Sequence, residues 1–353
     1  MLILDSHVPD SRIDILTPKP VYDIYSGNVN VEISAWDGDT AVENKRADAS
    51  HTANGLEMTD GISGLSSVYY EIRNNQKVTQ KGFLLKPGEK EKLRYTKEQI
   101  QIDGSLNNSN DIQIYVCMKD KAGNFSEKVK NILIDCTKPQ IRVSFDSQLP
   151  KNNWYFKDVR TATVEIREQN FRPDLVKIDV NSSNGMKPVM TQWTAGEKEG
   201  QSQIPDVYSC RIIFQDNGEY DFSVYCKDMA LNEAVIPYKS ERLIIDRQAP
   251  VIDICYDHHS SQSHSYYNHA RTATITVHEH YFDSNDVKIH VVSSLGGRYA
   301  DAPECTPWTD NGDVHTTSIT FNNEGDYILK ISYEDLAGNP SNSIEPQYFT
   351  LDF

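Results

Sequence analysis

The sequence predicts an all-β chain that folds as three tandem antiparallel β-sandwiches in an elongated array. The first supporting observation is an internal repeat: RTATVEIREQNFRPDLVKIDV starts at Arg160, and RTATITVHEHYFDSNDVKIHV starts 111 positions later at Arg271. The second is the strict alternation of apolar and polar residues in these segments, which is the period of a half-buried strand. The third is a junction motif that recurs along the chain and ends at Pro9, Pro139 and Pro250.

Alternation defines two strands in each repeat. The two RTAT segments place small or branched apolar residues on one face and polar residues on the other. These apolar residues are Ala162, Val164 and Ile166, then Ala273, Ile275 and Val277. A second alternating run comes near the end of each unit, at 112–118, 220–226 and 327–333. We predict that the first run is strand B and the second run is strand F, and that they lie on the facing sheets of one sandwich.

The junction motif sets the domain borders. It reads LILDSHVP, ILIDCTKP and LIIDRQAP, and its aspartates at Asp135 and Asp246 divide the chain into units 1–135, 136–246 and 247–353. The closing FTLDF matches the start of the motif, so we expect a segment cut at domain borders from a longer protein. That would explain why the first ten residues do not form a secretory signal.

The first unit diverges from the other two. It lacks the RTAT strand and carries an insertion near residues 40–60, while TDGISGLSSVYYEI at 59–72 is expected to form a strand. We expect this unit to be a divergent immunoglobulin-like domain with an insertion.

Turn sequences point to the immunoglobulin-like form of the sandwich. DNGEY at 216–220 and NEGDY at 323–327 put Gly ahead of the Tyr that starts strand F, as in a tyrosine corner. After strand F comes Asp-x-Ala-Gly-Asn, in which Gly123 and Gly338 suit the positive φ of a tight hairpin. Leu231 interrupts this pattern, so we expect a looser hairpin there, or Asn232 in the left-handed conformation.

Together, DxAGN, the junction motif, RTATITVxExxF and WTDNGDVHT at 308–316 resemble the bacterial immunoglobulin-like repeats of large surface proteins from Gram-positive anaerobes. The resemblance covers the second and third units fully and the first in part. It implies extracellular display on the cell surface or cell wall and a spacer or adhesion role. It implies no particular ligand, because so common a fold does not define a function.

The composition excludes some classes of binding partner. A formal charge of −16 opposes a phosphate backbone and argues against nucleic-acid binding. No apolar run approaches the roughly 18 residues of a membrane span, so we expect no membrane insertion by this segment. We expect a monomer whose partners are neighbouring immunoglobulin-like domains of the parent protein.

Carboxylates at the junctions are the main candidate site. The B–C and F–G loops lie at the end where a domain receives its predecessor, so two sets of acids are expected to converge there. They are Asp135, Glu168 and Asp228, and Asp246, Glu279 and Asp335. Such carboxylates with loop carbonyls would suit Ca²⁺ and stiffen the linker. The alternative is that they cap turns, and from sequence we assign no catalytic, cofactor or metal residue.

The cysteines and histidines leave alternatives open. Cys210 and Cys226 fall on inward positions of strands E and F, where they either bridge the core or remain buried thiols. The other cysteines have no evident partner: Cys117, Cys136, Cys255 and Cys305. A second set gathers after the first strand of unit three: His258, His259, His264 and His269. A zinc or nickel site or a solvated loop fits this set, and His315 is expected on a strand face.

Aromatic residues recur in register between units. Those before strand B are Trp154, Tyr155, Tyr266 and Tyr267, and those in mid-unit are Trp193 and Trp308. They would serve either to stack on sugar rings or to anchor the core and the junctions.

No catalytic fingerprint is present in the sequence, whether a nucleophile elbow, a zinc-protease motif or a phosphate loop. The sequence therefore predicts a non-catalytic stalk that displays other domains, with an enzyme as the least favoured class. The main alternative is a binding module that recognises a host glycan, mucin or immunoglobulin through loops or sheet edges.

Overall fold

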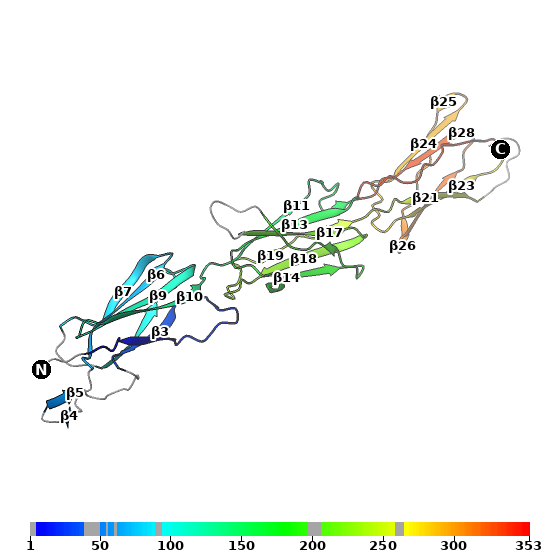
Figure 1. The fold of residues 1–353 in the computed structure, drawn as a ribbon. Coiled ribbons are helices and arrows are strands. Elements are labelled where there is room, and N and C mark those ends of the chain that lie inside the picture. The colour runs from blue at the N-terminus through cyan, green and yellow to red at the C-terminus, as the bar shows by residue number, and fades with distance from the viewer. Residues whose placement is uncertain are drawn as a thin grey trace.

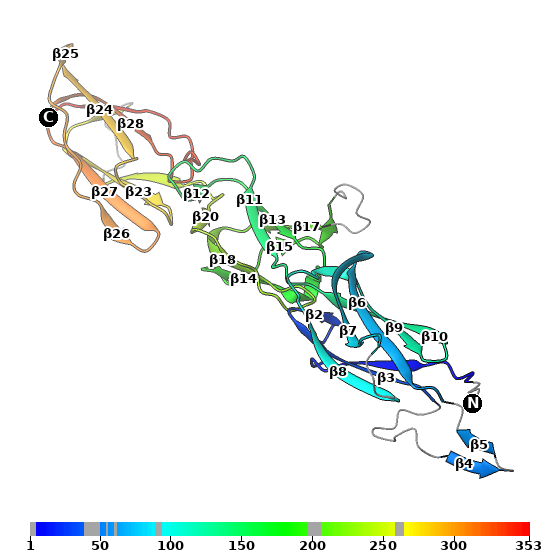
Figure 2. The ribbon, with the colours of Figure 1, turned by 90° about the vertical axis from the view of Figure 1, so that its left-hand side faces the viewer.

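The computed structural model describes residues 5–38, 50–53, 56–59, 62–88, 94–196, 206–257 and 265–353. In this part of the chain three β-sandwiches follow one another end to end, with the two termini at opposite ends of an elongated molecule (Figure 1). The view from the side shows the same linear order (Figure 2). No helix in the described ranges is long and apolar enough to cross a membrane.

The second unit shows the architecture most clearly. One sheet runs in the order β11 (Gln140–Phe145), β13 (Arg160–Arg167), β17 (Val207–Phe214), with β15 (Val189–Met190) and β16 (Thr194–Ala195) both on β17. The other runs β12 (Tyr155–Phe156), β20 (Leu243–Ile245), β18 (Gly218–Cys226), β14 (Val176–Ser182), with β19 (Tyr238–Lys239) also on β18. A short 3₁₀ turn, η1 (Pro173–Leu175), precedes β14.

The third unit repeats this order. Its first sheet is β21 (Val251–Tyr256), β23 (Arg271–His278), β27 (Val314–Phe321) and β26 (Thr309–Asn311). Its second sheet is β22 (Tyr266–Tyr267), β29 (Gln347–Leu351), β28 (Gly325–Ser332), β24 (Lys288–Leu295) and β25 (Arg298–Tyr299).

The first unit has the same two layers. They are β1 (Asp10–Ile15), β3 (Val29–Trp36) and β8 (Tyr95–Ile102), and β2 (Ile24–Tyr25), β10 (Phe125–Ile134), β9 (Ser109–Asp120), β6 (Leu65–Asn74) and β7 (Lys77–Leu85). A separate hairpin of β4 (Ser50–Ala53) and β5 (Leu56–Thr59) lies within the predicted insertion.

Strand direction identifies the fold. Among the described strands the pairings are antiparallel except for one short parallel pair in each unit, in which β2, β12 or β22 joins the last strand of its unit. In every unit the strands therefore take the positions A-B-E and A′-G-F-C of an immunoglobulin-like sandwich, and in the second and third units β15 or β26 lies beside strand E. The predicted fold class, all-β with tandem immunoglobulin-like sandwiches, is confirmed.

Each unit has its own core between the two sheets. The predicted inward residues of β13 and β23 have no exposed surface, and Phe214, Phe222 and Phe321 are fully buried. The three core clusters share no residue. Each sandwich therefore obtains its stabilising apolar burial within itself.

The tyrosine corners predicted from sequence are present. The Tyr220 hydroxyl donates to the carbonyl oxygen of Asp216 at 2.9 Å, and the Tyr327 hydroxyl donates to that of Asn323 at 2.9 Å. These bonds fix the turn that leads into strand F.

Two local expectations need correction. The first unit lacks the RTAT sequence but not the strand, because β3 lies between β1 and β8 as β13 lies between β11 and β17. Its own alternation, VNVEISAW, supplies the buried face. In the second unit Leu231 itself adopts the left-handed conformation, with φ +67°, rather than Asn232. Gly123 and Gly338 have positive φ as expected.

Candidate functional site

Buried carboxylates gather at one end of every unit. The clusters are Asp5, Asp37 and Asp120; Asp135, Glu168 and Asp228; and Asp246, Glu279 and Asp335. Within each cluster one ligand-capable oxygen per residue lies within 4.8 Å of the others. The convergence predicted for the second and third clusters is correct, and the first cluster was not predicted.

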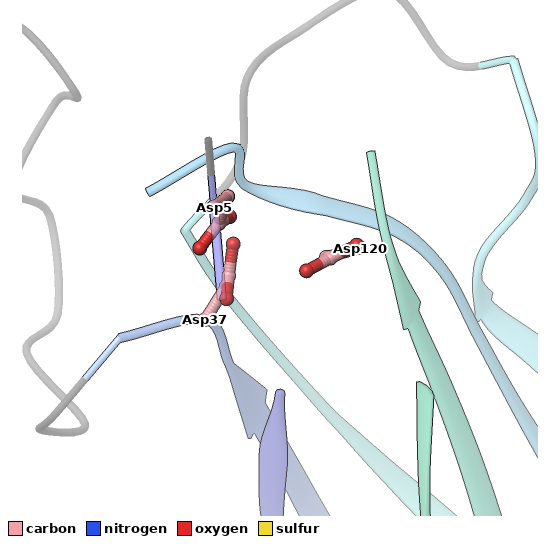
Figure 3. A group of neighbouring side chains, drawn as sticks. All are labelled: Asp5, Asp37 and Asp120. Carbon is pink, nitrogen blue, oxygen red and sulfur yellow. The ribbon is translucent and has the colours of Figure 1, made fainter. Parts of the chain in front are cut away.

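The same three positions of the fold supply each cluster. In the second cluster Asp135 follows strand β10 in the linker, Glu168 follows β13, and Asp228 lies just after β18. Asp37 follows β3 in the same way that Glu168 follows β13. Figure 3 shows the side chains of Asp5 and Asp120 extending toward Asp37 from separate segments.

The F–G aspartate of each cluster caps its own turn. Oδ1 of Asp335 accepts hydrogen bonds from the backbone N–H groups of Ala337, Gly338 and Asn339 at 2.7–2.9 Å. Oδ1 of Asp120 likewise accepts from Gly123 and Asn124. The turn-capping role considered from sequence is therefore real for this residue.

An asparagine in the same turn ties the linker to the unit. Nδ2 of Asn232 lies 2.8 Å from Oδ2 of Asp228 and donates to the carbonyl oxygens of Asp135 at 2.8 Å and Thr137 at 3.1 Å. We call this Asp–Asn pair, with the two linker carbonyls that it holds, the linker clamp. Sequence reasoning had assigned the asparagine only a place in the hairpin.

The linker clamp recurs in all three units. Asn124 pairs with Asp120 and donates to the carbonyls of Asp5 and His7. Asn339 pairs with Asp335 and donates to the carbonyl of Asp246 at 2.9 Å and, at 3.5 Å, to that of Gln248. The aspartate that begins the DxAGN motif therefore holds in position the glycine and the asparagine that end it.

Burial makes the acid after strand B hard to ionise. It raises the pKa of Glu168 to about 7; backbone N–H donors oppose the rise, and the Asp135 and Asp228 carboxylates add to it. The same causes raise the pKa of Glu279 to about 7. In the first cluster burial raises the pKa of Asp37 to about 6.

We expect stability to fall as pH rises in protein freed of divalent ions. Between the ordinary pKa of a glutamate and about pH 7, the folded chain still holds protons on Glu168 and Glu279 that the unfolded chain has released. The contribution of these protons to the stability of the folded state is therefore complete below the ordinary pKa and is lost as pH rises through about 7. Calorimetry in a chelator from about pH 5 to about pH 8 should show Tm falling. The double variant Glu168→Gln, Glu279→Gln should flatten the fall, and a Tm that rises over this range would contradict the expectation.

The remaining candidates have structural roles. Cys210 and Cys226 are free, and burial raises their thiol pKa to about 11 and about 12, so the buried-thiol alternative holds. His315 is buried on β27, where its ring stacks on Phe282 at a centroid distance of 4.0 Å. His258, His259 and His264 lie outside the described residues.

The recurrent aromatic residues divide between core and junction. Trp193 packs on Phe171 and Trp308 packs on Phe282, and both half-buried pairs pack against the core of their unit. Tyr155 of the second unit packs edge-on against Tyr281 of the third, with centroids 5.3 Å apart. The anchoring interpretation holds for these residues, while Trp154 and Tyr266 remain exposed.

Comparison with known proteins gives similarities of fold. No family model matches the sequence, and no curated protein matches it. Among solved structures, the chain is similar to the Escherichia coli adhesin FdeC, with 13% identity, 97% of each chain covered and a TM-score of 0.35. A titin I-band fragment has 10% identity, 97% coverage of each chain and a TM-score of 0.44. The extending region of a large adhesion protein has 14% identity over 99% of this chain and 75% of that one, with a TM-score of 0.41.

Proposed function

We propose that this chain is a non-catalytic spacer in an extracellular bacterial surface protein, with the linked sandwiches holding other domains away from the cell. The observation that carries the proposal is the linker clamp at each junction. The two carbonyl bonds of Asn232 and of Asn339 fix the linker against the unit that follows it. Proline in each linker, at Pro139 and Pro250, further restricts the backbone.

Direct contacts between units support a stiff array. At the second junction Nζ of Lys151 donates to the carbonyl of Asp335 at 3.0 Å and lies 2.7 Å from Oε1 of Glu334. At the first junction Nδ2 of Asn110 donates to Oδ1 of Asn170 at 3.0 Å. Contacts of this kind resist bending because tilting one unit breaks several bonds together.

The proposal predicts a narrow range of angles between units. In electron micrographs of single molecules the wild-type chain should be a straight rod. The double variant Asn232→Ala, Asn339→Ala should give a visibly broader angle distribution while each unit stays folded, because four bonds to the linkers are lost. Asn285→Ala is the matched control, since that amide bonds only within its own turn. Wild-type molecules as bent as a flexibly linked array would exclude the spacer function.

The alternative function is a binding module for a host glycan, mucin or immunoglobulin. Its support from aromatic residues is reduced, because Trp193 and Trp308 are half-buried and pack against the cores of their units. A glycan array with purified chain distinguishes the two proposals: the spacer function predicts no hit.

A further inference from the structure

Turn capping accounts for only part of the oxygen atoms in the acidic clusters. Glu168 accepts the N–H of Asn170 with Oε1 at 2.8 Å, and Asp246 accepts the N–H of Gln248 with Oδ1 at 3.1 Å. Asp37 accepts the N–H of Gly64 with Oδ2 at 2.7 Å. In each of these residues the second oxygen has no such role.

That second oxygen is buried without a partner in every cluster. Among the described residues, Oδ1 of Asp37, Oε2 of Glu168 and Oδ2 of Asp246 are buried and accept no hydrogen bond. The three residues are only 3–4% exposed, and no ion pair in the described part of the chain involves them. A buried carboxylate oxygen with nothing to bond is costly, so three of them, one in each cluster, need a common explanation.

The carboxylates around each unpartnered oxygen favour a cation as its partner over a neutral hydrogen-bond donor. Each unpartnered oxygen belongs to a group of three carboxylates whose ligand-capable oxygens lie within 4.8 Å of one another. Two oxygens on one Ca²⁺ are separated by at most about 5 Å, because each Ca²⁺–O distance is about 2.3–2.6 Å. The clusters therefore have the spacing of a shared cation.

We propose that the three acidic clusters are divalent-cation sites with a preference for Ca²⁺, one ion in each. The candidate ligand atoms are all carboxylate oxygens, which suit a hard cation rather than zinc or nickel. Ca²⁺ tolerates irregular geometry and six to eight oxygens, so water completes its shell. Mg²⁺ requires a near-ideal octahedron and gives up its water reluctantly, so it binds more weakly.

The site joins a linker to the unit that follows it. Asp135 and Asp246 come from the linkers, whereas Glu168 and Asp228, for example, belong to the second unit itself. An ion shared between them adds to the linker clamp without replacing it. This goes beyond the spacer function, since ion binding is measured by itself and a stiff array could exist without it.

Calorimetric titration of the chelator-treated chain with CaCl₂ tests the proposal. Wild type should take up three equivalents of Ca²⁺, one for each cluster. At a concentration about 100 times the Kd, Tm should rise by about 10 °C and return on adding chelator. Glu168→Gln should lower the stoichiometry to two and remove the Ca²⁺ shift of the second unit only, and Mg²⁺ should bind more weakly.

The Glu168→Gln variant distinguishes the loss of a cation site from a general loss of structure. Its amide oxygen still accepts the N–H of Asn170, and it removes one charge from a buried anionic group, so the ion-free protein should stay folded. Glu165→Gln on the same strand is the control with an equal charge change, and it should still take up three equivalents. Absence of Ca²⁺ uptake in wild type, or unchanged uptake in Glu168→Gln, would overturn the proposal.

Discussion

Phe222→Ala should lower the melting temperature of the second unit and leave those of the other two units unchanged. The Phe222 ring is fully buried on β18 and packs against Phe145, Phe214 and Tyr238, with centroids 5.4–6.2 Å apart. Removing a buried aromatic ring costs about 3–5 kcal/mol, a large part of the roughly 5–15 kcal/mol that holds a domain folded. In scanning calorimetry the transition of this unit should fall by more than about 10 °C.

The other two transitions should stay in place. The three core clusters share no residue, and changes at well-separated sites act independently. Tyr225→Ala is the control on the same strand, because that ring is 46% exposed and its loss opens no cavity. If all the transitions fell together in Phe222→Ala, the sandwiches would not be independent folding units.

Local periodicity explains why most of the sandwich could be predicted from sequence. Strands B and F alternate within eight or nine residues, as in β13 and β18, and each strand carries its own inward face. The tyrosine corners and the second and third acidic clusters follow from the repeat, because equivalent positions occupy equivalent places in the fold. Asp37 was missed because the first unit lacks the RTAT sequence that marked the acid after strand B.

Contacts made between distant segments were beyond that reasoning. Arg271 is in phase with the buried residues of β23, yet what makes its burial tolerable lies on other strands: its guanidinium is 3.6 Å from the ring centroid of Tyr256 on β21 and 4.0 Å from that of Tyr267 on β22. The linker clamp was also missed, because the direction of an asparagine amide depends on the turn that carries it. A pattern of residue types predicts neither the rings that cover Arg271 nor the direction of the asparagine amide.

Asp335→Ala should unfold the F–G turn of the third unit and free its linker. Asp335 has no exposed surface, and its Oδ1 accepts the backbone N–H groups of Ala337, Gly338 and Asn339. The N–H of Gly338 also bonds to the backbone carbonyl of Asp335, which the alanine variant keeps. Hydrogen bonds to a charged group contribute about 1.5–3 kcal/mol each. Relief of repulsion with Asp246 and Glu279 offsets part of the loss, so we expect about 3 kcal/mol and a Tm lower by about 10 °C, measured by calorimetry in a chelator.

Asp335→Asn separates turn capping from the linker clamp. Its amide oxygen can still accept the three N–H groups, but its Nδ2 would face Nδ2 of Asn339, and two donors cannot bond to each other. The third unit should therefore lose less stability than in Asp335→Ala, while Asn339 loses the contact that aims it at the carbonyl of Asp246. The angle between the second and third units should broaden in electron micrographs, and the first junction, held by Asn232, should not change. Equal loss of stability in the two variants, with an unchanged angle, would mean that Asp335 acts on the turn alone and that Asn339 holds the linker without it.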